Sequence, residues 1–438
     1  MLRIIRSSDR KQVESLILRR SRRLLQAEAV VKPIIEAVRR RGDRALIQYA
    51  RQLDGLRGRE IRVDPAILDE AALELPPPFR RAVELASGQI WEYCQMQMPR
   101  TWRKRVRPGL SVGQIVRPLD SVAAYIPGGR YPLPSTLLMT VVPAQVAGVK
   151  TISVASPSRH PLLLGAAGML GVRNFFQIGG AQAIAAFAFG TQTVPRADRI
   201  IGPGNIYVAA AKKLLAGETG IDFVAGPTEI VIIASDKKLR AHPQWVAADM
   251  LAQAEHDADA TAIFLTDSMR LAMRVAREVE AQLSTLHTQA VARKSIASNG
   301  AIIVTRSLEE AADIANRFAP EHISVPDSSF LSRISNAGSV FVGPWSPEAA
   351  GDYASGPNHV LPTGGTAARR GGLSVNDYVK VISVQELSRQ GLRYMAEAIT
   401  TLARAEGLEG HARSVEARLE PTGKPRRRTA SGPKGRDS

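Results

Sequence analysis

The sequence predicts an α/β protein with two similar Rossmann-like domains built on parallel sheets, plus helical N-terminal and C-terminal segments. Near residue 105 the pattern changes, and short β-branched runs begin to alternate with helical runs. This alternation occurs in two successive series, as expected for parallel strands covered by helices. Hydrophobic residues make up 45% of the 438-residue chain and charged residues 23%, which is typical of a globular protein with several domains.

Residues 1–104 are predicted to form a mainly helical segment. Apolar residues recur at helical spacing across 27–53, with arginines on the opposite face, a pattern that indicates an amphipathic helix. A second helix is expected from the prolines at 76–78 to about residue 98, with a short strand at 60–63 between the two helices.

Two α/β domains are expected to follow, over 105–222 and 223–383. A C-terminal helical segment is expected over 384–420, beginning with a helix at 384–405. The tail at 421–438 is rich in Pro, Gly, Ser and Arg and lacks core-forming residues, so it is predicted to be disordered. The expected strands are 114–118, 122–126, 151–155, 175–178 and 199–201 in the first domain, and 229–233, 261–265 and 301–304 in the second.

The formal net charge of +17 is concentrated at the two ends of the chain. Residues 1–60 contain 16 Lys and Arg against 7 Asp and Glu, and residues 421–438 contain 6 against 1. The middle of the chain is nearly balanced, so nucleic acid is not an expected partner.

Three observations predict a cytoplasmic protein. No run of about 18 apolar residues occurs, so no membrane span is expected. The N-terminus is basic and has no apolar signal region. Cys94 is the single cysteine and cannot form an intrachain disulfide, which fits a reducing compartment.

Four residues form a candidate zinc site. Gln253 and His256 are three residues apart at the end of an expected helix, so both can project from one helix face toward the same ion. With Asp352 and His411 they would form a mixed nitrogen and oxygen shell. Spacing alone does not show that the four converge, and His256 can also be explained as a helix-end histidine that interacts with the dipole.

Glu321 and His322 form a candidate general-base pair. They follow Pro320, which restricts the backbone, and a carboxylate beside an imidazole suits proton transfer. The alternative is a solvated strand start. His359 lies in a long loop rich in Gly and Pro, of a kind that often carries functional residues.

Two glycine-rich turns are candidate cofactor contacts. IGGAQAIAAFAFGT and IGPGNIYVAAAKKLL each place glycine between a strand and a helix, where helix N-terminal amides suit phosphate. Neither matches the dinucleotide fingerprint GxGxxG, and each can also be a plain tight turn. Tyr125 adds an aromatic ring beside another Gly-Gly turn.

The segment IDFVAGPTEI at 221–230, followed by QAEH at 253–256, resembles the signature of the histidinol dehydrogenase family. Further motifs of the family occur in family order between about residues 20 and 419. They are YIPGG at 125–129, GGAQAIAA at 179–186, GPGN at 202–205, PEH at 320–322, GSVFVGPWSPEAAGDYASGPNHVLPT at 338–363 and AEGLEGHARSV at 405–415.

This resemblance implies a homodimer that uses NAD and one zinc ion per subunit. It implies oxidation of L-histidinol through L-histidinaldehyde to L-histidine, with reduction of two NAD. Glu321 and His322 would be the catalytic bases, and the C-terminal segment would complete the partner's site. The implied contacts are Tyr125, Gln182 and Asn205 for NAD; Gln253, His256, Asp352 and His411 for zinc; and Thr228, Gln253, His256, His322, Asp352, His359, Glu406 and His411 for substrate.

Two alternatives remain, one a related enzyme and one from a different functional class. A dehydrogenase of the same superfamily that acts on another small polar alcohol would keep the NAD contacts and the Glu321–His322 pair. A nucleic-acid-binding or regulatory protein would account for the basic ends, but no aromatic-rich basic motif accompanies them. Assays with L-histidinol and with DNA distinguish the three.

Overall fold

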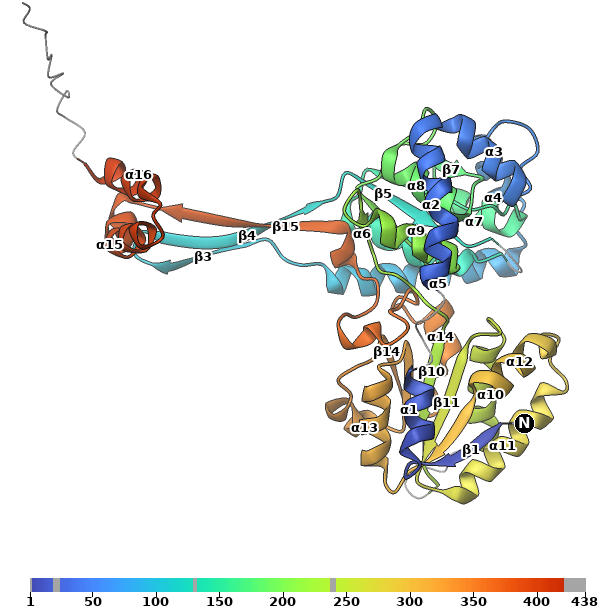
Figure 1. Ribbon diagram of the computed structural model, residues 1–438. Helices are drawn as coiled ribbons and strands as arrows, with labels where there is room; N and C mark the ends of the chain where they lie inside the picture. The colour runs from blue at the N-terminus through green and yellow to red at the C-terminus, as the bar shows by residue number, and fades with distance from the viewer. Residues whose placement is uncertain (1, 19–23, 129–131, 237–241, 421–438) are drawn as a thin grey trace, which may run out of the picture. The chain divides into compact units, whose positions relative to one another are not determined.

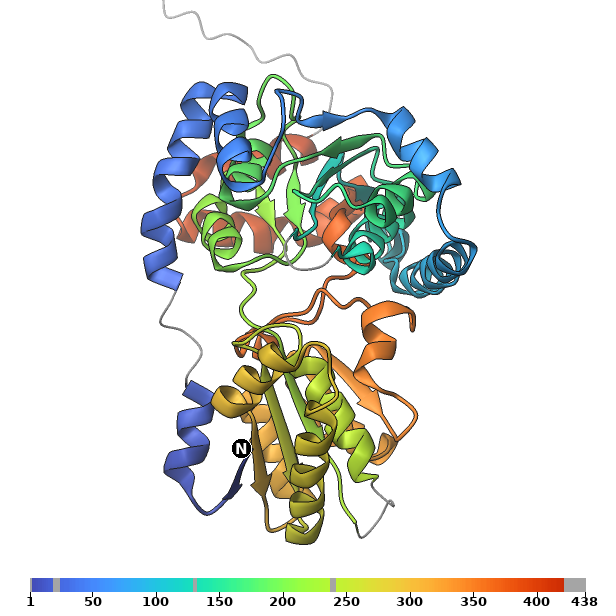
Figure 2. The ribbon, with the colours of Figure 1, turned by 90° about the vertical axis from the view of Figure 1, so that its right-hand side faces the viewer.

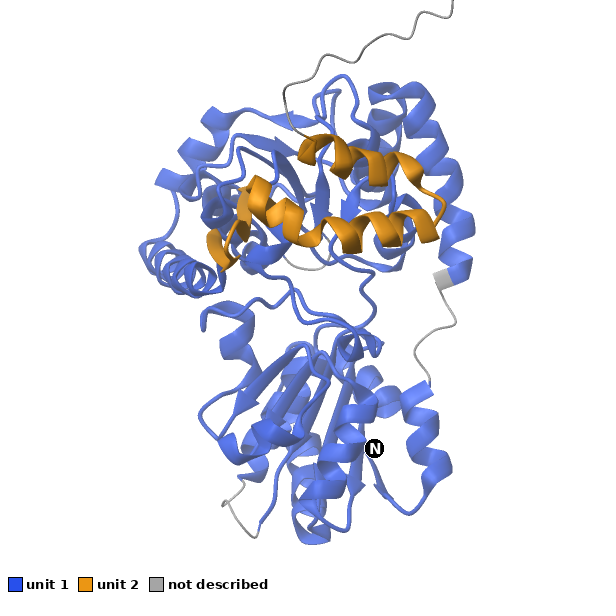
Figure 3. Cartoon of the chain, turned by 90° about the vertical axis from the view of Figure 1, so that its left-hand side faces the viewer, with its two compact units in different colours: residues 1–98, 118–379 blue, residues 99–117, 380–438 orange. Residues whose placement is uncertain are grey.

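The computed structural model describes residues 2–18, 24–128, 132–236 and 242–420 (Figure 1). The chain forms two compact units, one of residues 1–98 and 118–379, the other of residues 99–117 and 380–438 (Figure 3). The tail predicted to be disordered, 421–438, lies outside the described residues. No helix in the described ranges has the length and apolar character needed to cross a membrane.

The first sheet of the larger unit has the strand order β2-β7-β6-β5-β8-β9. Its strand pairs are parallel except for β2 with β7. From β5 the chain winds outward to β7 and then returns to the other side of β5, so the winding direction reverses between β5 and β8. These strands are β2 (Arg62–Val63), β5 (Ser121–Tyr125), β6 (Thr151–Ala155), β7 (Asn174–Phe176), β8 (Arg199–Ile201) and β9 (Gly220–Ile221).

Helices enclose this sheet, and α2, α3, α8 and α9 supply one continuous apolar core with it. The helix expected over 27–53 is two helices, because Gly42 at φ 51° ends the first and begins the second. The backbone of Gly42, with φ 51° and ψ −133°, has a conformation that residues with a side chain rarely adopt, so glycine is favoured there. The helices are α2 (Leu24–Arg41), α3 (Asp43–Leu53), α4 (Pro65–Leu73), α5 (Pro77–Gln97), α6 (Pro134–Ala147), α7 (Pro161–Met169), α8 (Gly180–Phe189) and α9 (Ile206–Leu215).

The second sheet has the order β1-β12-β11-β10-β13-β14, and its pairs are parallel (Figure 2). Its winding reverses between β10 and β13. One face packs against α10, α11 and α12, and the other against α1 and α13. The elements are β1 (Arg3–Arg6), α1 (Arg10–Leu18), β10 (Glu229–Ile233), α10 (Pro243–Ala254), β11 (Thr261–Thr266), α11 (Met269–Leu283), α12 (Gln289–Asn299), β12 (Ala301–Val304), α13 (Leu308–Phe318), β13 (His322–Val325), β14 (Ser339–Val342) and α14 (Glu348–Tyr353).

These two sheets confirm the predicted pair of α/β folds, but the N-terminal segment differs from the prediction. β2 lies within the strand expected at 60–63 and pairs with β7 in the first sheet, whereas β1 was not expected and pairs with β12 in the second. Each strand adds backbone hydrogen bonds at a sheet edge that would otherwise be unpaired, a long-range gain that local helical spacing does not reveal.

In its described residues, up to 420, the smaller unit contains a three-stranded sheet, β15-β4-β3, and two helices. The helix expected over 384–405 begins at Arg389 instead, because residues up to Leu387 extend β15 and Ser388 caps the helix by accepting a hydrogen bond from the Gly391 N–H. The elements are β3 (Trp102–Arg107), β4 (Leu110–Pro118), β15 (Val379–Leu387), α15 (Arg389–Ala405) and α16 (Glu409–Leu419).

Candidate active site

Polar side chains converge at the amino ends of β10 and β13, where the winding of the second sheet reverses. Thr228 immediately precedes β10, and Glu321 and His322 stand at the start of β13. Parallel α/β sheets usually bind ligands at the carboxyl ends of their strands. The cluster therefore uses the opposite edge of the second sheet.

The connection from α13 to β13 fixes the direction of this pair. Ala319 adopts a left-handed conformation at φ 42°, the one positive-φ residue other than glycine in the described ranges. Its N–H donates to the carbonyls of Ala315 and Asn316 and so caps α13. A left-handed alanine costs about 1 kcal/mol, and Pro320 has a fixed φ, so Glu321 follows two residues whose backbone is constrained.

The carboxyl of Glu321 is held by the residues that begin β10. Its Oε2 lies 2.5 Å from the Thr228 hydroxyl and accepts a hydrogen bond from the Glu229 N–H at 3.0 Å. Burial raises the pKa of Glu321 well above its usual value, and these hydrogen bonds oppose the rise. A buried carboxyl with a raised pKa can exchange a proton near neutral pH.

The imidazole of His322 is buried and oriented from its Nδ1 side. Nδ1 lies 3.2 Å from the Glu229 carbonyl oxygen and 3.2 Å from Oε1 of Glu348. The Glu229 carbonyl can only accept a hydrogen bond, so the ring proton belongs on Nδ1. Nε2 is buried with no hydrogen-bond partner among the described residues. Burial lowers the pKa of His322 to about 4, so Nε2 carries a free lone pair at neutral pH.

Helix α14 contributes two carboxyls, one turn apart. Glu348 faces Nδ1 of His322, while Asp352 Oδ1 lies 3.7 Å from Nε2 of the same ring. Asp352 Oδ2 also lies 3.7 Å from Nε2 of His256. The structure thus brings His256, His322 and Asp352 together although they are far apart in the sequence.

Gln253 joins the cluster from the last turn of α10. Its amide is best oriented with the nitrogen toward the Glu348 carboxyl and the oxygen 2.6 Å from the Thr228 hydroxyl, because the reverse places oxygen against oxygen. The helix ends at Ala254, so His256 does not share a helix with Gln253 as expected. The chain tightens after Gln253, whose carbonyl accepts from the His256 N–H at 3.4 Å, and His256 still faces Asp352.

These donors fit a bound cation. Burial is the main cause of the raised pKa of Glu348, and the charges of Asp352, Glu321 and Asp249 raise it further. A divalent ion would relieve this repulsion, and nitrogen and oxygen donors together suit zinc. In the described part of the chain, the ligand atoms of His322, Glu348 and Asp352 lie within 4.8 Å of one another. Of these three, only Asp352 belongs to the ligand set that the sequence predicts.

His359 lies beside the cluster. Its Nδ1 is 2.7 Å from the carbonyl oxygen of Asp352, and its Nε2 is 3.3 Å from the hydroxyl of Thr136. Thr136 belongs to the first turn of α6. This contact ties the loop of His359 to the helix that follows β5.

Tyr125, Gln182 and Asn205 surround the carboxyl ends of β5 and β8, where the first sheet reverses. This is the place where α/β sheets bind nucleotides. The Tyr125 hydroxyl accepts from the Gly180 N–H at 3.1 Å, and Asn205 caps α9 by accepting from the Tyr207 and Val208 N–H groups. Oε1 of Gln182 is buried without a hydrogen-bond partner in the described residues, so it can accept from a ligand.

Asp54 is a residue of this region that the sequence interpretation missed. Its Oδ2 accepts hydrogen bonds from the Gly179 N–H and from Nε2 of Gln182, both at 2.9 Å. The amides at the start of α8 were expected to suit phosphate, but a carboxylate already occupies part of that position. Only the fold could reveal this, because Asp54 is more than 120 residues away in the sequence.

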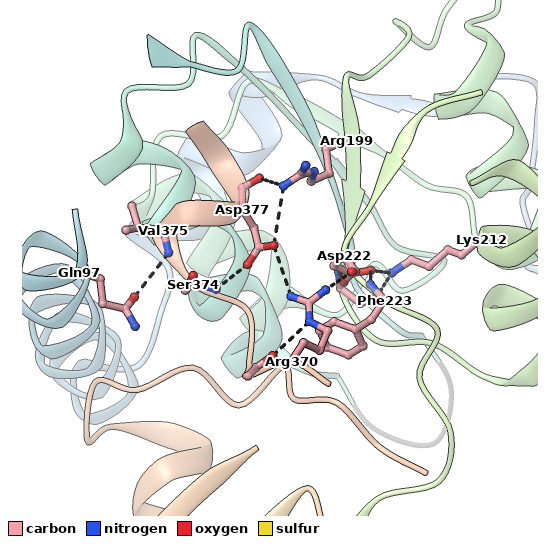
Figure 4. A network of polar contacts seen from close by, with 11 residues as sticks. Gln97, Arg199, Lys212, Asp222, Phe223, Arg370, Ser374, Val375 and Asp377 are labelled. Atoms are coloured by element: carbon pink, nitrogen blue, oxygen red, sulfur yellow. Dashed lines mark hydrogen bonds and ion pairs between the residues drawn. The ribbon is translucent and has the colours of Figure 1, made fainter. Parts of the chain in front are cut away.

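A buried ion pair supports the turn that carries Asn205 (Figure 4). Nζ of Lys212 lies 2.6 Å from Oδ1 of Asp222, and both side chains are almost fully buried. Asp222 also accepts from the Gly202 N–H at 2.8 Å. Arg370 donates to the Asp222 carbonyl and stacks on the Phe223 ring. The network therefore fixes the chain on both sides of Asn205.

Glu406 and His411 belong to the smaller unit, where Glu406 ends α15 and His411 lies in α16. Both residues are exposed there. Their participation in the active site remains a prediction.

Comparisons with known proteins give a consistent picture. The family model for histidinol dehydrogenase matches residues 18–419. The chain is 43% identical over 430 residues to histidinol dehydrogenase from Methanothermobacter thermautotrophicus, covering 96% of this chain and 100% of that protein. It is 48% identical over 395 residues to the Thermus thermophilus enzyme, covering 89% and 94%. The crystal structure of histidinol dehydrogenase from Elizabethkingia anophelis matches with a TM-score of 0.90 at 33% identity, covering 95% and 98%.

Proposed function

The chain belongs to the histidinol dehydrogenase family, and we propose that it oxidises L-histidinol through L-histidinaldehyde to L-histidine, with reduction of two NAD, in histidine biosynthesis. The observation that carries this proposal in the structure is the unpartnered, buried Nε2 of His322. This nitrogen can accept a proton, and the side chains around it can bind a cation.

In the first oxidation, Nε2 of His322 accepts the hydroxyl proton of L-histidinol as hydride leaves the carbon that bears the hydroxyl group. In the second, Glu321 accepts a proton from the water that adds to the aldehyde, while His322 returns its proton to the carbonyl oxygen. His322 then accepts a hydroxyl proton of the hydrate as a second hydride leaves the carbon. Thr228 and the Glu229 N–H hold the Glu321 carboxyl for this role. NAD would supply the hydride acceptor, and zinc would supply a fixed positive centre that binds substrate nitrogens.

The residues that would hold these groups follow from their positions. Tyr125, Gln182 and Asn205 would contact NAD at the reversal of the first sheet. Gln253, His256 and Asp352 would bind zinc, with His411 as the fourth ligand, and His359 and Glu406 would contact the substrate. We place Glu406 and His411 in the partner's site, which makes the active enzyme a homodimer with one zinc per subunit, and we expect it in the cytoplasm.

The test is NADH formation by the purified protein with L-histidinol, before and after treatment with a chelator. Two NADH should form per L-histidinol, activity should fall on chelation, and zinc should restore it. L-Histidinaldehyde should also be oxidised. An enzyme that prefers another small amino alcohol, or that does not act on L-histidinol, would contradict the proposal.

A further inference from the structure

We propose that Glu348 is a positioning residue for His322, holding the ring so that Nε2 faces the reacting hydroxyl. Resting on the proposed histidinol oxidation, this role adds a residue outside the pair Glu321 and His322. The sequence interpretation did not single out Glu348. Its spacing of four residues from Asp352, on the helix α14, was the available signal.

The geometry at Nδ1 carries the argument. Oε1 of Glu348 lies 3.2 Å from Nδ1, and the residue is only 3% exposed. The Glu229 carbonyl oxygen lies 3.2 Å from the same nitrogen. Two acceptors at Nδ1 select the tautomer that carries its proton there. The lone pair then resides on Nε2, the ring nitrogen that has no hydrogen-bond partner in the described residues.

Glu348 contributes more than the carbonyl can. When Nε2 accepts the substrate proton, the ring becomes positively charged, and a carboxyl beside Nδ1 stabilises that charge more strongly than a neutral carbonyl does. No bond to substrate is involved, because Glu348 acts through the ring.

A second contact fixes the carboxyl itself. The amide nitrogen of Gln253 donates to Oε1 of Glu348 and lies 3.3 Å from Oε2. The Glu348 carboxyl therefore accepts a hydrogen bond from the His322 ring on one side and from the Gln253 amide of α10 on the other. Its own freedom to move is small, which is required of a group that orients another.

Glu348 could instead be a metal ligand, since its oxygen lies within 4.8 Å of ligand atoms of His322 and Asp352. The experiment separates the two roles. Glu348→Gln and Glu348→Ala are purified with wild type, and zinc per subunit, KM and kcat are measured for L-histidinol and L-histidinaldehyde. Glu348→Gln keeps a hydrogen-bond acceptor but lacks an ionisable carboxyl, and Glu348→Ala lacks both.

For a positioning residue, kcat falls about 10-fold in Glu348→Gln and about 100-fold or more in Glu348→Ala, on both substrates. KM and zinc content stay within about 2-fold of wild type. Loss of zinc with a raised KM would overturn the assignment and make Glu348 a ligand. An unchanged kcat in an active wild-type background would also overturn it, whereas an inactive wild type would instead contradict the proposed function.

Asp249→Asn is the matched control. Asp249 is a half-buried carboxyl on α10 that acts electrostatically on Glu348. Within the described part of the chain it forms no hydrogen bond or ion pair with His322. The kcat of Asp249→Asn should stay within about 3-fold of wild type. A loss equal to that of Glu348→Ala would show that the effect does not depend on contact with Nδ1 of His322 and would overturn the specific role.

Discussion

The Thr228 hydroxyl lies 2.5 Å from the Glu321 carboxyl, which joins the residue before β10 to the residue before β13. The neighbouring Glu229 N–H donates to the same carboxyl oxygen. Glu321 is therefore oriented by the adjacent strand, while the imidazole of His322 is oriented by the carbonyl of Glu229. One short stretch of β10 positions both members of the base pair.

This arrangement predicts different effects for the two bases. His322→Asn should lower the rate of both oxidations by about 100-fold or more, because each releases a proton. Glu321→Gln should impair oxidation of L-histidinaldehyde more than oxidation of L-histidinol. Single-turnover NADH formation with each substrate measures this, and equal losses in Glu321→Gln would contradict the division of roles.

Asp249 gives a pH-dependent prediction. Burial raises its pKa from 3.8 to about 6, so its contribution to stability is present below about pH 4 and is lost as pH rises through about 6. Asp249→Asn cannot ionise, so the variant does not lose this stability as pH rises. The variant should match wild type near pH 4 and exceed it by about 1–3 kcal/mol near pH 8. Denaturant unfolding at both pH values, with equal zinc loading, tests the sign, and a constant difference would contradict the assignment.

Lys212 and Asp222 provide a stability test with a neighbouring control. Lys212→Met leaves the Asp222 carboxylate buried without its cation and should cost about 3–5 kcal/mol. Lys213→Met removes the adjacent lysine, whose ion pair with Glu28 is partly exposed, and should cost less than about 1 kcal/mol. Chemical unfolding of both variants gives the comparison. Similar losses of unfolding free energy in the two variants would mean that the buried Lys212–Asp222 pair contributes little to stability.

Asp54 should affect cofactor binding. Asp54→Ala removes two hydrogen bonds that hold Gly179 and Gln182, and NAD affinity should weaken about 10-fold as these groups become mobile. Asp69→Ala, which removes an exposed ion pair with Arg173, is the control. Calorimetric titration of NAD measures both. Tighter binding by Asp54→Ala would show that the carboxylate repels the dinucleotide instead.

The proposed shared site predicts complementation between inactive variants. His411→Asn should lose zinc, since one of four proposed ligands is removed, while Glu321→Gln should keep it. After subunit exchange, each heterodimer would have one site with both defects and one with neither. Activity should return to about half of wild type per heterodimer, because one of the two sites in the symmetric dimer is intact. No recovery, with exchange verified by mass, would assign His411 to its own chain.

The local sequence was sufficient for the types of most elements and for the motifs. Alternating β-branched and helical runs predicted the two parallel sheets, because hydrophobic periodicity reflects which side of each element is buried. It located β2, which lies within the strand expected at 60–63, but it missed β1, since a short edge strand is selected by its distant partner. The same periodicity predicted one continuous helix through Gly42 and began the helix expected at 384–405 inside β15. At both places tertiary contacts outweigh local propensity.

The sequence by itself determined the family, the strand and helix alternation and the chemical identity of the site residues, because these are written in local patterns. Only the tertiary structure decided that Glu348 faces His322, that Asp54 covers the start of α8, and that the cluster uses the amino ends of β10 and β13. These relationships depend on the winding order of the sheets. That order brings together residues about 20 to 130 positions apart, and no local pattern encodes such distances.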